Sequence, residues 1–266
     1  MKRFVPILLM LASLLATDMA SAGRSCDARK PSVQSITNGL SLAERTQQAF
    51  ERDYRSSGSS VLILARAGQD LSKYGLRYSH LGLAYREQSG NWRVLHKLNH
   101  CGSADAFIYR QGLGEFFLDD PARYETAWVA ASPALRDRLL PMLRDGNRAL
   151  RLNVKPYSMV SYAWGRQYQQ SNQWLLETVA WAMEPDANTR DTAQAWLKLK
   201  GYQPTVLRLG PLTRLGGRLT AANITFDDHP PDKRFSDQIA TVTADSVFDW
   251  LQRSGLGGPM QSVRLP

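Results

Sequence analysis

The stretch at residues 169–183, QQSNQWLLETVAWAM, carries the first residue whose type and position could do chemistry. Its apolar residues recur at the i, i+3, i+4, i+7 spacing of a helix with one buried face, and Ser171 begins that stripe. A hydroxyl in the first turn of such a helix could be a nucleophile supported by the helix dipole and by free backbone amides. The alternative is an N-cap, which is the commoner use of serine at a helix start.

Two of the four histidines, His80 and His96, fall in short segments that favour β-strands. The turn residues at 88–91 predict that strands at 78–85 and 92–98 form an antiparallel hairpin, which brings His96 alongside His80. Strand alternation places His80 on a face of small residues, so a helix packed on that face could bring its first turn to His80. The alternatives are a core histidine bonded to a carbonyl for His80 and a surface residue for His96.

The order of these residues resembles that of circularly permuted NlpC-type, papain-like proteins, among them the lecithin-retinol-acyltransferase-like proteins. The match covers about residues 59–180. Ser79-His80-Leu81-Gly82 resembles the strand motif, His96 the neighbouring strand position, and the segment 170–174 the helix start. As a whole the chain is similar to a bacterial domain-of-unknown-function family, number 2145. The resemblance implies an α+β, papain-like fold with a small antiparallel sheet packed against helices, in which His80 is the general base and His96 orients it.

The resemblance also implies a cysteine nucleophile at the helix start, where this chain has Ser171. A helix dipole helps to form a thiolate but not an alkoxide, so Ser171 would need His80 as a base during the attack itself. We expect a hydrolase or acyltransferase acting on an amide or ester of the cell envelope, with a Ser-His-His arrangement. The second hypothesis is a catalytically silent relative that binds envelope peptide, glycan or lipid. The third is an envelope interaction protein without a groove function.

Three further residues are expected to bind substrate. Asn172 and Gln173 follow the serine and could donate hydrogen bonds to an oxyanion or a glycan hydroxyl. Tyr78 precedes the histidine motif on the same predicted strand. The alternative for Gln173 is an exposed position on the helix.

Cys26 and Cys101 are expected to form a disulfide, because two cysteines of an exported protein pair by default in an oxidising compartment. The alternative makes Cys101, next to His100, a reactive thiol. Zinc binding by His96, His100 and Cys101 with Asp105 is disfavoured, since the spacing of the first three requires a helix or tight turn where a strand end is expected. Asp227-Asp228-His229 has the composition of a polar loop. We expect no metal and no other cofactor.

The N-terminal residues have the order of a cleavable secretory signal. Lys2 and Arg3 precede an apolar run at 4–16 that is too short to span a bilayer, and small residues lead to a cleavage site near Ala22. We therefore expect a periplasmic or secreted protein, which disfavours nucleic acid as a partner. Cleavage removes two cations and one anion, so the formal charge becomes +9 − 2 + 1 = +8. A basic surface suits anionic envelope polymers or phospholipid head groups, or serves solubility alone.

Apolar periodicity and turn residues predict the elements that position these side chains within one domain at residues 23–266. No later segment has the length and apolar character of a membrane span. We expect helices at 41–54, 132–143, 169–183 and 189–200, with Ser132 as the N-cap of the second, and strands at 61–65, 78–85, 92–98, 124–130 and 205–209. We also expect a loose arm at 23–37, an aromatic and partly helical segment at 104–118, an extended segment at 153–162, a Gly-rich turn at 210–217, and a strand and helix at 239–254.

Overall fold

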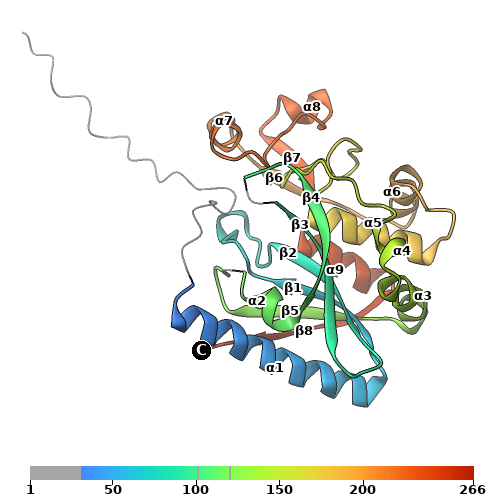
Figure 1. The fold of residues 1–266 in the computed structure, drawn as a ribbon. Coiled ribbons are helices and arrows are strands. Elements are labelled where there is room, and N and C mark those ends of the chain that lie inside the picture. Colours follow the sequence, from blue (N-terminus) through green and yellow to red (C-terminus); the bar gives the residue numbers. More distant parts are fainter. Residues whose placement is uncertain (1–30, 101, 120) are drawn as a thin grey trace, which may run out of the picture.

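A six-stranded antiparallel sheet forms the centre of the molecule in a computed structural model, which describes residues 31–100, 102–119 and 121–266 (Figure 1). The strand order β4-β3-β2-β1-β5-β8 makes β4 and β8 the edges of the sheet. Helices pack on the sheet, so the fold is α+β with an antiparallel sheet, as predicted. The strands are β1 (Val61–Arg66), β2 (His80–Arg86), β3 (Trp92–Asn99), β4 (Ala106–Gly112), β5 (Glu125–Ala131) and β8 (Gly257–Arg264).

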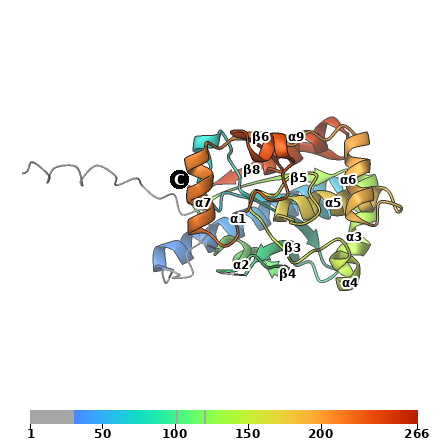
Figure 2. The same cartoon turned by 90° about the horizontal axis from the view of Figure 1, so that it is seen from above.

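Helices cover both faces of this sheet (Figure 1, Figure 2). α1 and α2 lie on one face, while α3, α5 and α9 lie on the other, with α6 packed against α5. Successive side chains of a strand point to opposite faces, so a central strand covered on both sides is buried throughout, as in β1, which is apolar up to its last residue, Arg66. The helices are α1 (Val33–Ser57), α2 (Leu113–Phe117), α3 (Pro133–Arg144), α4 (Gly146–Leu150), α5 (Ser171–Met183), α6 (Arg190–Leu199) and α9 (Ala244–Arg253), and a 3-10 turn, η1, spans Ser72–Tyr74.

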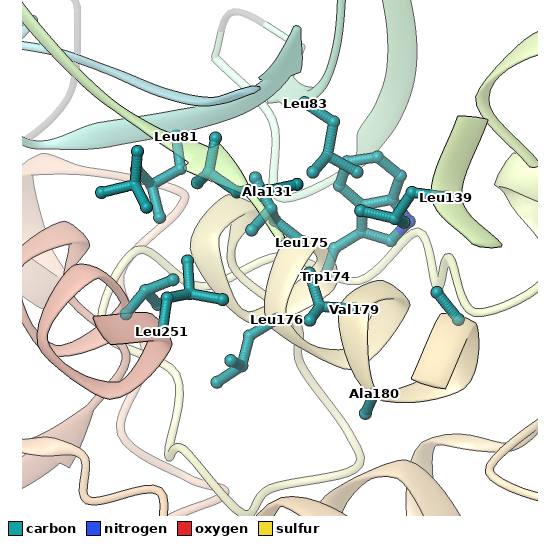
Figure 3. Packing of buried hydrophobic residues seen from close by; sticks show 14 of the residues in the cluster. Leu81, Leu83, Ala131, Leu139, Trp174, Leu175, Leu176, Val179, Ala180 and Leu251 are labelled. Carbon is teal, nitrogen blue, oxygen red and sulfur yellow. The ribbon is translucent and has the colours of Figure 1, made fainter. Parts of the chain in front are cut away.

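α5 is the central helix of the larger apolar cluster (Figure 3). Trp174 and Leu175 pack with Leu81 and Leu83 of β2, and the predicted stripe is buried. Burial extends around the helix, since eleven of its thirteen residues are buried. The helix lies on the face of β2 that carries the large residues, so the expectation that it packs on the small-residue face is wrong.

The small-residue face of β2 is filled by α2 and by the neighbouring strand. A Cβ atom added at Gly82 would lie 2.5 Å from Val94 of β3 and 3.3 Å from the ring of Phe116 in α2. Glycine is therefore required at residue 82 by close packing, and α2 leaves no room for α5 over this part of β2.

β2 and β3 separate at the end of the pair that carries His80 and His96. Their ladder joins residues 83–86 to residues 92–95, so neither His80 nor His96 takes part in it. The N–H of Leu81 instead donates to Oδ1 of Asn172 at 2.9 Å. The first turn of α5 thus occupies the opening between the two strands, which is how a helix on one face reaches a histidine of the other.

A two-stranded sheet adjoins the larger one and carries the remaining helices. β6 (Thr205–Arg208) pairs antiparallel with β7 (Gln238–Thr241), and α7 (Pro211–Thr220) and α8 (Pro231–Arg234) lie between them in sequence. The residues at 210–217 are therefore mostly helical, and the prediction of a Gly-rich turn is wrong. Among the helices of the described ranges, none combines the length and apolar character that crossing a bilayer requires.

The predictions were most successful for buried elements and least successful at the edges. The strand at 61–65, the hairpin of β2 and β3, and the helix capped by Ser132 are confirmed. The segment at 104–118 begins with edge strand β4, and the pattern does not predict edge strand β8. α1 begins at Val33, so the expected loose arm is helical from that residue.

Candidate functional site

The structure brings Ser171, His80 and His96 into one hydrogen-bonded row. Oγ of Ser171 lies 3.2 Å from Nδ1 of His80, and Nε2 of His80 lies 2.8 Å from Nδ1 of His96. Gln170 is the N-cap residue of α5 and Ser171 is its first helical residue, so the N-cap alternative for Ser171 is wrong. The hydroxyl faces a histidine from another element instead of its own helix backbone.

A fourth residue, Gln111 of β4, sets the direction of the protons in this row. Its Oε1 lies 2.8 Å from Nε2 of His96 and can only accept, so Nε2 of His96 carries a proton. Nδ1 of neutral His96 then accepts from Nε2–H of His80, which leaves Nδ1 of His80 free to accept the proton of Ser171. This order is the one that a general base needs.

Both histidines are held neutral. Burial lowers the pKa of His80 well below its ordinary value, and the positive charge of Arg66 and the neighbouring His96 lower it further. Burial, with the charge of Arg66, lowers the pKa of His96 to about 3, although the hydrogen bond to Gln111 and the charge of Asp119 oppose that shift. Neutral rings are consistent with the proton order set by Gln111.

Arg66 is a charged group that acts on both histidines of this row. It lies opposite His80 in the ladder of β1 and β2, and its guanidinium bonds the carbonyl of Phe116 and the carboxylate of Asp119. Its Cζ lies 4.7 Å from the centre of the Phe116 ring, which in turn packs on the His96 ring at 5.1 Å. Arg66 therefore opposes a positive charge on either histidine.

Tyr157 contacts the serine from the segment that precedes α5. Burial raises the pKa of the Tyr157 phenol to about 12, although the neighbouring Ser171 hydroxyl lowers it. The backbone N–H of Tyr157 bonds the carbonyl of Ala104 at 2.6 Å, which fixes the segment beside β4. The sequence gives no signal for this residue, because the segment at 153–162 has no periodicity that would place one of its side chains at the helix start.

Asn172 and Gln173 are both buried and both bound to the protein. The Asn172 amide accepts from Leu81 and donates to the carbonyl of Val242 at 3.4 Å. The Gln173 amide donates to the carbonyl of Ala163 at 3.1 Å, so the alternative of an exposed Gln173 is wrong. These contacts hold the first turn of α5 in place.

Tyr78 is directed to a different cluster. Its hydroxyl donates to the carboxylate of Glu125 at 2.8 Å, and its ring contacts Phe248. Arg77 bonds the same carboxylate. Tyr78 therefore does not lie in the Ser171 row. Asn172, which is also predicted to bind substrate, does lie next to that row.

The other candidate residues do not converge on a metal site. Both ring nitrogens of His96 are engaged by His80 and Gln111, and the parts of the chain that the structure describes hold no cluster of three or more possible metal ligands. Cys26 and Cys101, with the predicted disulfide and the reactive-thiol alternative, lie outside the described residues.

Comparison with known proteins gives one match. The model of a family described as "Uncharacterized protein conserved in bacteria (DUF2145)" matches residues 53–251, a range that includes Ser171, His80, His96 and Gln111. No curated protein and no solved structure matches the chain.

Proposed function

The chain belongs to the bacterial family DUF2145, whose description names no activity. We therefore propose its function from the site itself: hydrolysis or transfer of an acyl group by a papain-like domain with a serine nucleophile. The observation that supports the proposal is the hydrogen-bonded row from Ser171 through His80 and His96 to Gln111, from which the order of protons is inferred. An ordinary N-capping serine would not require a histidine at its hydroxyl or an acceptor behind that histidine.

In the proposed reaction, Oγ of Ser171 attacks the carbonyl carbon of an amide or ester while its proton passes to Nδ1 of His80. His80 then gives that proton to the leaving nitrogen or oxygen as the carbonyl carbon's bond to it breaks, which leaves an ester on Ser171. Water, or an acceptor hydroxyl or amine, releases the acyl group by the same steps in reverse. His96 keeps the His80 ring in the tautomer that accepts at Nδ1.

The first turn of α5 is placed to stabilise the oxyanion. The first N–H groups of a helix have no acceptor within it, and the side chain of N-cap residue Gln170 makes no capping bond. These donors and the positive end of the helix dipole lie beside Ser171, where negative charge develops. The phenol of Tyr157 lies near the Ser171 hydroxyl and is a further donor in this proposal.

The cell envelope is the proposed place of action. The signal-like order of Lys2, Arg3 and the apolar run at 4–16 supports export with cleavage near Ala22, and the basic charge supports anionic envelope partners. The intact mass of the protein recovered from an envelope fraction checks the cleavage. An uncleaved mass would contradict this part of the proposal.

Labelling with a fluorophosphonate probe tests the nucleophile. We expect covalent modification at Ser171, located by peptide mass spectrometry, and its loss in Ser171→Ala. Removing the base in His80→Gln should slow labelling by about a hundredfold or more, since general-base catalysis contributes on that order. The matched control is Ser89→Ala, which removes an exposed hydroxyl and should label like the parent. No labelling at Ser171 would remove the acyl-transfer proposal.

A silent binding module is the second candidate, and a specific observation favours it. Ser171 and His80 are only 4% and 8% exposed, and Arg66 opposes the imidazolium that the reaction forms. In that case the protein would bind an envelope peptide or glycan without turnover. Two results together would support this candidate. The fluorophosphonate probe would fail to modify Ser171, and calorimetry would show that the protein binds such a ligand, more weakly in Tyr157→Ala.

A further inference from the structure

α7 has its apolar side turned away from the protein. Leu212, Leu215 and Leu219 recur at i, i+3 and i+7 and therefore share one face of the helix. They are 84%, 54% and 77% exposed. The helix lies at the periphery of the molecule in both views (Figure 1, Figure 2). A surface helix of a soluble protein normally buries such a stripe, so this orientation needs an explanation.

The inner side of α7 is fixed by an arginine. Arg214 is buried, and its guanidinium donates to the carbonyls of Leu209, Lys233, Arg234 and Gln238 at 2.8 to 3.2 Å. These bonds join α7 to α8 and to β7. Rotating the leucines inward would remove the four acceptors of a buried cation, so the outward stripe is a built feature of the fold.

Gly217 contributes to the same inner side. A Cβ atom added there would lie 3.3 Å from Ile224, so the helix backbone sits close to the segment that follows it. Polar and small residues thus face the protein, and the leucines face outward together with the exposed ring of Phe235 at the end of α8.

The stretch of chain that contains the stripe is basic, although aspartates follow it at residues 227, 228, 232 and 237. Between residues 201 and 226 the chain has three arginines, Arg208, Arg214 and Arg218, and no aspartate or glutamate. Arg208 and Arg218 are exposed. Arg218 and Arg234 both bond the carboxylate of Asp227, so two cations share one anion. An outward leucine stripe with arginines beside it and no carboxylate on its own helix complements a surface that is both apolar and anionic.

We propose that the outward face of α7 docks on an anionic phospholipid surface, with the three leucines in the acyl boundary and the exposed Arg208 and Arg218 at the head groups. A second copy of the chain is a poorer occupant, because pairing two α7 helices would bring Arg218 of each together while each Asp227 already bonds both Arg218 and Arg234 of its own protomer. This interaction does not depend on the proposed acyl chemistry.

Cosedimentation with vesicles tests the docking face. The protein beginning at Gly23 retains the whole described fold and lacks the apolar run at 4–16. We expect it to bind vesicles of equal parts phosphatidylcholine and phosphatidylglycerol, and to bind phosphatidylcholine alone at least about tenfold more weakly. The combined change Leu212→Ser, Leu215→Ser and Leu219→Ser should lower binding to the mixed vesicles by about tenfold or more.

Two further variants test whether binding is specific to this face of α7 or arises from exposed apolar side chains in general. Leu199→Ser removes an equally exposed leucine on α6, 80% exposed, and should bind like the parent. Arg208→Glu should weaken binding by about fivefold, and added salt should reduce the difference. The triple variant should unfold at the same denaturant concentration as the parent, because exposed leucines are not part of the core.

Three results would overturn the proposal. The triple variant could bind the mixed vesicles like the parent, or phosphatidylcholine alone could bind equally well. Sedimentation velocity could instead show a dimer of the parent that the triple variant loses, which would make α7 a self-association face.

Discussion

His96 and Lys97 are neighbours on β3, yet they belong to two different polar systems. His96 joins the row of Ser171, His80 and Gln111, in which each ring nitrogen of either histidine has one partner and the groups are neutral. Lys97 points to the opposite face because strand side chains alternate. Its ammonium donates to the carbonyl of Val154 at 2.6 Å and to Oε1 of Gln169 at 2.8 Å.

The network on the Lys97 side is charged and multiply bonded. Gln169 donates to Glu177 at 2.6 Å, and Glu177 also accepts from Arg190 at 2.9 Å and from Gln194 at 2.8 Å. Glu177 lies in the middle of α5, one and a half turns beyond Ser171. The network therefore fixes the helix and the segment before it, while the neutral row at the helix start keeps a proton that can move.

The comparison teaches that burial alone does not identify a site. Both systems are almost inaccessible to solvent, and both combine β3 with α5. They differ in the number of partners and in charge. Each ring nitrogen of the Ser171 row has one partner and the row is neutral, whereas the groups of the Lys97 network have several partners each and include charged side chains. The following changes test that difference, beginning with the one expected to have the largest effect.

Replacing Glu177 should break the charged network and destabilise the folded protein. Glu177→Leu leaves the guanidinium of Arg190 buried without its anion and leaves Gln169 and Gln194 without an acceptor. We expect the free energy of unfolding in denaturant to fall by about 3–5 kcal/mol. Asp186→Ala removes an exposed carboxylate as a control and should change it by less than about 0.5 kcal/mol. A loss below about 1 kcal/mol for Glu177→Leu would mean that the network does not stabilise the fold.

The two systems should affect stability in separate pH ranges. Burial and the charge of Arg190 lower the pKa of Lys97 from 10.5 to about 7, while the charge of Glu177 raises it. Between pH 7 and 10.5 the unfolded chain binds a proton at Lys97 that the folded chain does not, so stability rises with pH by up to about 1.4 kcal/mol per unit. The lowered pKa of His96, about 3 against 6.5, produces the corresponding rise between pH 3 and 6.5.

Lys97→Met isolates the alkaline range. The unfolding free energy of this variant, measured from pH 7.5 to 9.5, should lack the rise that the parent shows, while the acid range stays as in the parent. An equal slope in both proteins over the alkaline range would show that Lys97 is not the titrating group.

Removing the last acceptor of the row should have the smallest effect on stability. Gln111→Ala takes away the partner of Nε2–H of His96, which should lower stability by about 1 kcal/mol and Ser171 labelling by about fivefold to tenfold. Nitrogen NMR of the His96 ring should show one tautomer in the parent and a mixture in the variant. Gln47→Ala changes an exposed glutamine of α1 and serves as control. A single unchanged tautomer in Gln111→Ala would show that Gln111 does not set the proton order.

The sequence by itself determined the elements whose periodicity is strong. β1, β2, β3 and β5 are apolar or alternating runs with turn residues between them, and α3 begins with a serine cap that uses only local bonds. α5 has a helical stripe of its own. The order of a histidine strand, a second strand and a late serine helix was also readable, because it needs no knowledge of packing.

The tertiary structure alone decided which of these residues meet. The separation of β2 from β3 lets the first turn of α5 reach His80 from the opposite face, and no local pattern encodes that opening. Gln111 lies on an edge strand with weak alternation, and Tyr157 lies in an irregular segment, so both become part of the site only through long-range contacts. The outward stripe of α7 depends in the same way on the carbonyls around Arg214, three of which are 19 to 24 residues away in the sequence.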